Sequence, residues 1–157
     1  MAQDEKVKQL IMEYLDEGKL MQIATSNAGR PWVATVWYAH DKDMNLYWIS
    51  KRMRRHSMEL EKNPNVAGTI VKPHTVGSGE KVRGLQFEGT ARPCNGREFK
   101  IADELYMKKY PDADRVPPIL KGVTNFIATF YVAKPSAIVL FDEINFPKDP
   151  RQELKLG

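Results

Sequence analysis

The stretches LMQIAT at 20–25, WVATVWYA at 32–39 and LYWIS at 46–50 decide the fold of this chain. Each is rich in β-branched and aromatic residues, which favour extended strands. The residues between them, NAG at 27–29 and DKD at 41–43, have the chemistry of tight turns. The order therefore predicts three consecutive antiparallel strands in a meander.

Further helix and strand signals lie on both sides of this meander. An apolar helical face over 7–15 predicts an N-terminal helix that ends at Gly18. After the meander, the segments 66–71 and 83–93 have the composition of strands. A loop at 73–81, which contains two glycines, is expected to join them.

The second half of the chain begins with a helix-start signal. Asn95 is a candidate N-cap with Glu98 three residues later, which resembles a capping box, and Pro111 ends this helix. A short helical turn is expected near 114–120. Two last strands, at 125–133 and 137–146, are expected on either side of Lys134-Pro135-Ser136, and the tail from Pro147 is polar.

These elements amount to about seven strands, mostly in meander order, with three or four helices. Short strands at this spacing, separated by turn signals, favour a closed or partly closed barrel. Helices and strands alternate too rarely for a doubly wound parallel sheet. We therefore expect one domain over residues 1–157, mainly β: a small antiparallel β-barrel with peripheral helices.

Composition restricts the classes of function. The chain has 157 residues, 42% of them hydrophobic and 28% charged, as in a globular protein in water. It has no apolar run of membrane-spanning length and no signal peptide, so no membrane association and a cytoplasmic location are expected. The single cysteine, Cys94, excludes an internal disulfide. The net charge of +4 favours an anionic ligand and keeps nucleic acid as a candidate partner.

A basic stretch, KRMRRH at 51–56, precedes a short predicted helix at 57–62. The cations lie at the positive end of the helix dipole, and Glu59 and Glu61 lie toward its negative end. Arg55 and Glu59 are also in the less favourable i,i+4 order. This arrangement is explained by a bound anion, most simply a phosphate, and equally by a solvated basic turn.

The order of several motifs resembles that of the FMN-binding split-barrel proteins, the pyridoxamine 5′-phosphate oxidase-like superfamily. The motifs are GRP at 29–31, LYWIS at 46–50, the basic turn and helix closing on NPNVA at 63–67, and GLQFEG at 84–89. VAGT at 66–69 and DEINF at 142–146 resemble a small, poorly characterised branch. The resemblance covers nearly the whole chain and implies a Greek-key split barrel.

The resemblance also implies a homodimer that binds FMN at the subunit interface, together with a small-molecule substrate. The strand Ala34, Thr35, Val36 and Trp37 would run along the isoalloxazine ring. Ile49 and Ser50 would lie near the ribityl phosphate, and Arg55 and His56 would bind the phosphate, with Lys51 and Arg54 as further candidates. Gln86 would reach the polar edge of the ring, and Arg151 would complete the partner's site.

Several positions depart from the family oxidase. Ala34 stands where the oxidase has a phosphate-binding arginine, Ala39 where it has a substrate-contacting lysine, and Gly84 where it has a glutamine. The chain also lacks the Arg-x-His substrate clamp, so vitamin B6 oxidation is not expected. His56, in place of lysine, is expected to be only partly charged near neutral pH.

The first functional hypothesis is an FMN-dependent oxidoreductase that transfers hydride between the flavin and a small substrate. No residue is assigned a catalytic role. The alternatives are a non-catalytic flavin-binding or redox-sensing module and a haem or deazaflavin protein, with His40 or His74 as axial ligand. Both histidines are otherwise expected to be solvent-exposed, and no metal site is expected. Nucleic-acid binding ranks last, because Glu59 and Glu61 follow the cations directly.

Overall fold

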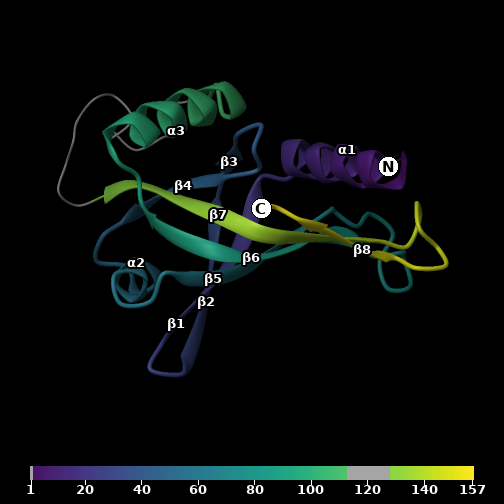
Figure 1. Cartoon of the computed structure of the whole chain (residues 1–157), viewed down its shortest axis with the longest axis horizontal. Helices are drawn as coiled ribbons and strands as arrows, with labels where there is room; N and C mark the ends of the chain where they lie inside the picture. The colour runs from purple at the N-terminus through teal and green to yellow at the C-terminus, as the bar shows by residue number, and fades with distance from the viewer. Residues whose placement is uncertain (1, 113–127) are drawn as a thin grey trace.

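The computed structural model describes residues 2–112 and 128–157 (Figure 1). The helical turn expected near 114–120 and the start of the strand expected at 125 lie outside the described residues. The helices are α1 (Ala2–Glu17), α2 (Arg55–Leu60) and α3 (Gly96–Lys109). The strands are β1 (Leu20–Asn27), β2 (Arg30–Trp37), β3 (Ala39–His40), β4 (Leu46–Lys51), β5 (Asn65–Val71), β6 (Arg83–Pro93), β7 (Ala128–Asp142) and β8 (Arg151–Lys155).

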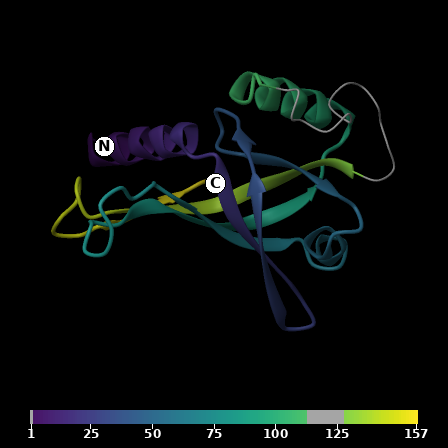
Figure 2. The same cartoon turned by 180° about the vertical axis from the view of Figure 1, so that it is seen from behind.

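The described strands form one antiparallel sheet in the order β2-β1-β5-β6-β7-β4-β3, with β8 paired to β7. β2 and β3 lie at opposite ends of this order, yet only Tyr38 separates them in the chain. The sheet must therefore curl until its two ends meet, and Figures 1 and 2 show this curvature with α1 and α3 on one side. The predicted mainly antiparallel fold, a partly closed barrel with peripheral helices, is confirmed.

The predicted meander is only partly correct. β1 and β2 form a hairpin from Asn27↔Arg30 to Leu20↔Trp37, and Ala28 and Gly29 both have positive φ at its turn. The segment 32–39, however, is divided at Tyr38, whose N–H donates to Lys19 O. β4 then pairs with β3 and β7 and not with β2, because the chain crosses to the other end of the sheet there.

The two last predicted strands are one long strand, β7. Its first half pairs with β4 and its second half with β8, while β6 follows its other edge. Pro135 does not end the strand, because the register between β6 and β7 shifts at Glu88/Gly89 and leaves Ser136 as an extra residue. Gly89 permits this close approach, since a Cβ there would lie 2.2 Å from Lys134 O.

The polar tail is also partly strand, contrary to prediction. β8 pairs residue by residue with β7 from Ala137↔Lys155 to Phe141↔Arg151. At the other end of the chain, α1 ends before Gly18 as predicted, and a Cβ on Gly18 would lie 2.5 Å from the Tyr38 hydroxyl. Asn95 and Glu98 form the predicted capping box of α3.

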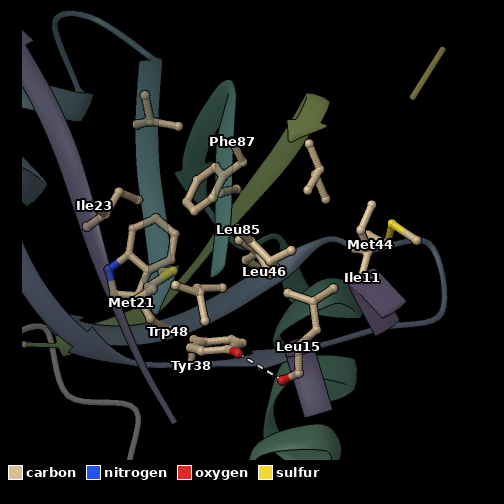
Figure 3. Packing of buried hydrophobic residues seen from close by; sticks show 14 of the residues in the cluster. Ile11, Leu15, Met21, Ile23, Tyr38, Met44, Leu46, Trp48, Leu85 and Phe87 are labelled. Atoms are coloured by element: carbon tan, nitrogen blue, oxygen red, sulfur yellow. Dashed lines mark hydrogen bonds between the residues drawn. The ribbon is translucent and has the colours of Figure 1, made fainter. Parts of the chain in front are cut away.

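The main core lies inside the curled sheet and is covered by α1 (Figure 3). Ile11 and Leu15 of α1 pack with side chains of several strands, and Tyr38 donates its hydroxyl to Leu15 O at 2.8 Å. A second cluster packs α3 against the other face of β4. β4 therefore alternates, with Leu46 and Trp48 in the main core and Tyr47 and Ile49 in the second cluster.

Candidate functional site

The basic turn, residues 51–54, connects the end of β4 to α2. Lys51 is the last residue of β4, and α2 begins at Arg55, two residues earlier than predicted. Its three cations, Lys51, Arg52 and Arg54, are exposed, and their side chains make no hydrogen bond or ion pair with the described part of the chain. α2 has only six residues, so the anion affinity of this region depends on side chains more than on a helix dipole.

Arg55 is held between a carboxylate and an aromatic ring. Its Nε donates to Glu59 Oε1 at 2.8 Å, and its guanidinium carbon lies 4.3 Å from the centre of the Trp32 ring. Glu59 is buried and also accepts the Thr25 hydroxyl at 2.5 Å. The hydrogen bonds from Thr25 and Arg55 lower the pKa of Glu59 below its usual value. The unfavourable order of Arg55 and Glu59 thus has a structural explanation, because Arg55 neutralises a buried carboxylate.

His56 lies in a buried chain of polar side chains. Its Nε2 is 2.8 Å from Ser50 Oγ, and Ser57 donates to Ser50 Oγ at 3.2 Å. All three side chains are buried. Burial lowers the pKa of His56, and the nearby Arg54 lowers it further. His56 and Ser50, which the resemblance places at the phosphate, are therefore bonded to each other directly beneath the basic turn.

β2 contacts α2 through Trp32 and Arg55, and one edge of β2 has no strand partner among the described residues. Ala34 and Val36 pack against the main core, whereas Thr35 and Trp37 are exposed on the other face. The Trp37 side chain is 51% exposed, with its ring 5.5 Å from Tyr110 in a T-shaped contact. β2 comes close to β4 without pairing with it, which leaves the barrel split at this place.

Gln86 and Arg151 lie together in a hollow of about 410 Å³ over β5 to β8. Glu153, which pairs with Arg151 at 3.2 Å, also lines it. Following the strand pairing from β2 through β1 and β5 to β6 leads from Thr35 to Gln86. The two side chains therefore lie on the same face of the sheet, three strand spacings apart. At about 4.8 Å per strand this is about 14 Å. One chain therefore separates the predicted residues into two groups, one at β2, β4 and the basic turn and one in this hollow.

Sequence reasoning missed the residues that organise the basic turn. Thr25 and Glu59 were not recognised, because their contact joins β1 to α2 and no local pattern predicts it. Glu153 was missed because the strand β8, which places it beside Arg151, was not predicted. Ile49 packs with the cluster under α3, because β4 presents alternate side chains to its two faces, and its position near the ribityl phosphate stays a prediction.

The histidines suggested as haem ligands have different environments. His40 is largely buried, contrary to the expectation of exposure, with Nε2 2.8 Å from Asp16 and Nδ1 3.0 Å from Asp41 O. His74 is exposed. Cys94 is half-buried, and burial raises the pKa of its thiol to about 12. Residues 2–112 and 128–157 contain no metal-binding cluster of histidine, cysteine and carboxylate side chains, and no helix there is long and apolar enough to span a bilayer.

Comparison with known proteins places the chain in a family. The profile of the family described as pyridoxamine 5′-phosphate oxidase matches residues 7–129, most of the chain. The chain therefore belongs to this family, as the resemblance implied. A UPF0306 protein of Photorhabdus laumondii is 27% identical over 104 residues, which cover 66% of this chain and 71% of that protein. This likeness fits the small, uncharacterised branch.

Solved structures share the fold at low sequence identity. A haem-binding protein from Mycobacterium smegmatis superposes with a TM-score of 0.73 at 15% identity, over 94% of this chain and 56% of that one. HutZ, a haem storage protein from Vibrio cholerae, gives 0.61 at 22% identity, over 81% and 88%. A putative pyridoxamine 5′-phosphate oxidase from Listeria innocua gives 0.65 at 16%, over 85% and 97%. These likenesses show the fold and no ligand of this chain.

Proposed function

We propose that the protein binds FMN, with its phosphate on the basic turn and its ring along the free edge of β2. The observation that carries this proposal is the group of three exposed cations, Lys51, Arg52 and Arg54, whose side chains have no partner in the described chain. The next cation, Arg55, contacts Trp32 of β2, a strand with one unpaired edge among the described residues. Membership of the pyridoxamine 5′-phosphate oxidase family gives the cofactor class.

The donor set suits a phosphate monoester. A phosphate accepts several charge-assisted hydrogen bonds, which are about twice as strong as neutral ones. Lys51 and Arg54 offer their full charge to it, whereas Arg55 offers only the amino groups that Glu59 does not occupy. The free N–H and C=O groups of β2 suit the polar rim of an isoalloxazine ring, because they require hydrogen-bond partners.

FMN, when bound, supplies hydride chemistry, and we propose that the protein is an oxidoreductase acting on a small molecule. The chain's own part is to hold the phosphate, to orient the ring against β2 and to exclude water on the core side through Ala34 and Val36. Ala34 and Ala39 offer no charge to a phosphorylated substrate. We therefore propose a substrate other than pyridoxamine 5′-phosphate.

A homodimer would bring the two groups of predicted residues together. Leu20, Val33 and Trp37 leave large apolar side chains exposed on the outward face of β1 and β2. Side chains of this kind are typical of protein interfaces. A second copy on this face would place its own Gln86 and Arg151 near the first copy's ring. Within one chain, Gln86 is about 14 Å from Thr35 of β2.

The test is the visible spectrum of the purified protein, with mass spectrometry of any released cofactor, followed by FMN titration. We expect a two-band flavin spectrum, or quenching of flavin fluorescence when FMN is added. Riboflavin, which lacks the phosphate, should bind more weakly than FMN. A protein that binds neither flavin would overturn the proposal.

Haem binding is the second candidate, because two solved structures with this fold are described as haem proteins. An axial ligand must have a free ring nitrogen, and both nitrogens of His40 are occupied. His74 makes no hydrogen bond to a described residue and would be the ligand. A Soret band that disappears in His74→Gln would support this candidate, whereas a flavin spectrum that is unchanged in His74→Gln would exclude it.

A further inference from the structure

The hydrogen-bond chain Ser57–Ser50–His56 bears on the protonation state of the buried His56 ring, next to the basic turn in the chain. Ser57 Oγ lies 3.2 Å from Ser50 Oγ, and a hydrogen bond donated by Ser57 leaves the Ser50 hydroxyl hydrogen for another acceptor. Two acceptors are in reach, His56 Nε2 at 2.8 Å and Lys51 O at 3.4 Å. The shorter contact has the usual length of a strong hydrogen bond, and the longer one does not. Donation from Ser50 to His56 uses the shorter of the two contacts, and in this arrangement Nε2 carries no proton.

The surroundings of the imidazole favour the same state. His56 and Ser57 are 8% and 1% exposed, so water cannot solvate a positive charge on the ring well. Among charged groups, Arg54 beside it disfavours the protonated ring, and Glu59 on the next turn of α2 favours it. Glu59 is already bonded to Thr25 of β1 and to Arg55, which reduces its effect on His56. Burial is the largest of these effects and lowers the pKa of His56.

We propose that His56 is an uncharged positioning residue, which fixes the Ser50 hydroxyl at the end of β4 and remains uncharged when a phosphate binds to the basic turn. The charge of the phosphate would then be balanced by Lys51, Arg54 and Arg55 alone. This inference rests on the proposed FMN site for its second half. It replaces the role of direct phosphate ligand that the family resemblance gave to position 56.

The first experiment observes the ring directly in the ligand-free protein. Nitrogen NMR of ¹⁵N-histidine-labelled protein distinguishes protonated and neutral rings and the two neutral tautomers. We expect His56 to be the tautomer protonated at Nδ1 at pH 7, titrating below the ordinary value of 6.5. His74→Gln and His40→Gln identify the other two signals. A protonated His56 at pH 7, or a proton on Nε2, would overturn the inference.

The second experiment measures proton uptake when FMN binds to the wild-type protein. Calorimetric titration at pH 7.5, in two buffers that differ in ionisation enthalpy, reports the protons exchanged with the buffer. The phosphate is already almost fully ionised at this pH, since its second pKa is about 6. We expect no net uptake. Uptake of roughly one proton per FMN that is lost in His56→Gln would show that His56 becomes a charged ligand, and would overturn the inference.

Variants separate positioning from charge. His56→Gln keeps a neutral acceptor for Ser50, so FMN affinity should stay within about twofold of wild type. Ser50→Ala removes a hydroxyl whose single hydrogen this arrangement gives to His56, so no hydrogen bond to the phosphate is lost and FMN affinity should also stay within about twofold of wild type. A tenfold loss in His56→Gln with unchanged affinity in Ser50→Ala would contradict the inference. Failure of the wild-type protein to bind FMN would instead remove the proposed function, and the NMR titration would still decide the state of His56.

Discussion

Cations lie at two helix ends of this molecule, and the two ends use them differently. At the C-terminal end of α1, Leu15 O accepts hydrogen bonds from Lys109 Nζ and the Tyr38 hydroxyl, each at 2.8 Å. Lys109 also lies 4.1 Å from the centre of the Tyr38 ring. The basic turn before α2 carries Lys51 and Arg54, whose side chains are exposed and have no partner among the described residues.

The difference separates a structural cation from cations available to a ligand. Lys109 lies at the end of a helix where the dipole favours positive charge, and its amine satisfies a carbonyl that has no helical partner. The basic turn lies at the end where the dipole disfavours positive charge, and nothing in the described chain compensates it. A fold gains little from cations in such a place, and the bound anion that we propose would explain them.

The largest effect is expected for Arg55→Ala, because Arg55 is both a structural cation and a cation of the proposed phosphate site. Its loss leaves the buried Glu59 carboxylate with Thr25 alone, which should lower the free energy of unfolding by about 2 kcal/mol. FMN affinity should also fall, by at least about 1.5 kcal/mol. Urea unfolding and FMN titration measure the two effects separately.

The pH dependence provides a check on Arg55→Ala. The pKa of Glu59 is lowered in the folded state, so the ionised carboxylate stabilises the folded protein above the ordinary pKa of 4.5. This stabilisation is lost as the pH falls through the lowered pKa. The stability difference between wild type and Arg55→Ala should therefore shrink in acid. Arg92→Ala, which breaks the ion pair with Glu98, is a matched control and should leave FMN affinity unchanged. Unchanged FMN affinity in Arg55→Ala would remove Arg55 from the site.

The second prediction concerns Lys109 and alkaline pH. Burial lowers the pKa of its amine from 10.5 to about 8 in the folded protein. Between these values the unfolded chain binds more protons, so the contribution of Lys109 to stability rises with pH. We expect wild type to gain about 1–2 kcal/mol relative to Lys109→Met between pH 7.5 and 10. Urea unfolding at both pH values measures this gain, and a constant difference would contradict it.

The third prediction, Tyr38→Phe, removes a buried hydroxyl and leaves Lys109 as the donor to Leu15 O. The free energy of unfolding should fall by about 1 kcal/mol, the net value of one hydrogen bond. FMN affinity should not change, because this end of α1 makes no part of the proposed site. A variant that loses FMN affinity while keeping its stability would show that the C-terminal end of α1 and the basic turn before α2 do not have separate roles.

The smallest effect on stability is expected for Arg54→Gln. An exposed cation without a partner should change the free energy of unfolding by less than about 0.5 kcal/mol. FMN affinity should nevertheless fall several-fold, and this loss should decrease at high salt, where exposed charges are screened. Thermal unfolding and FMN titration at two salt concentrations measure both effects. A clear loss of stability would mean that Arg54 has a structural partner.

Sequence reasoning predicted the strands and helices whose signals are local. β1, β5, β6 and the capping box of α3 follow from β-branched composition and from Asn95 and Glu98. β8 was missed because RQELK has no apolar face, and it becomes a strand only because the edge of β7 pairs with it. The break expected at Pro135 was wrong because a bulge accommodates the proline.

The candidate site was predictable in its residue types and not in its contacts. The basic stretch indicated an anion site, and the resemblance gave residues at the same place in the chain. The burial of His56 and its bond to Ser50 depend on the approach of α2 to the end of β4, which no spacing predicts. The separation of Gln86 from Thr35 likewise depends on strand order, a property of the whole sheet.

Tyr38 is the single residue that connects β2 and β3, the two ends of the sheet, and this connection affects the order of folding. The β1–β2 hairpin closes through a two-residue turn and needs only neighbouring residues. Joining the ends of the sheet requires β4 to find β7 across β5, β6 and α3, a contact of high sequence separation. Such contacts raise the contact order and slow folding. We expect substitutions in β7 to change the refolding rate more than substitutions in the hairpin turn. This result would identify the pairing of β4 with β7, which joins the two ends of the sheet, as the slow step of folding.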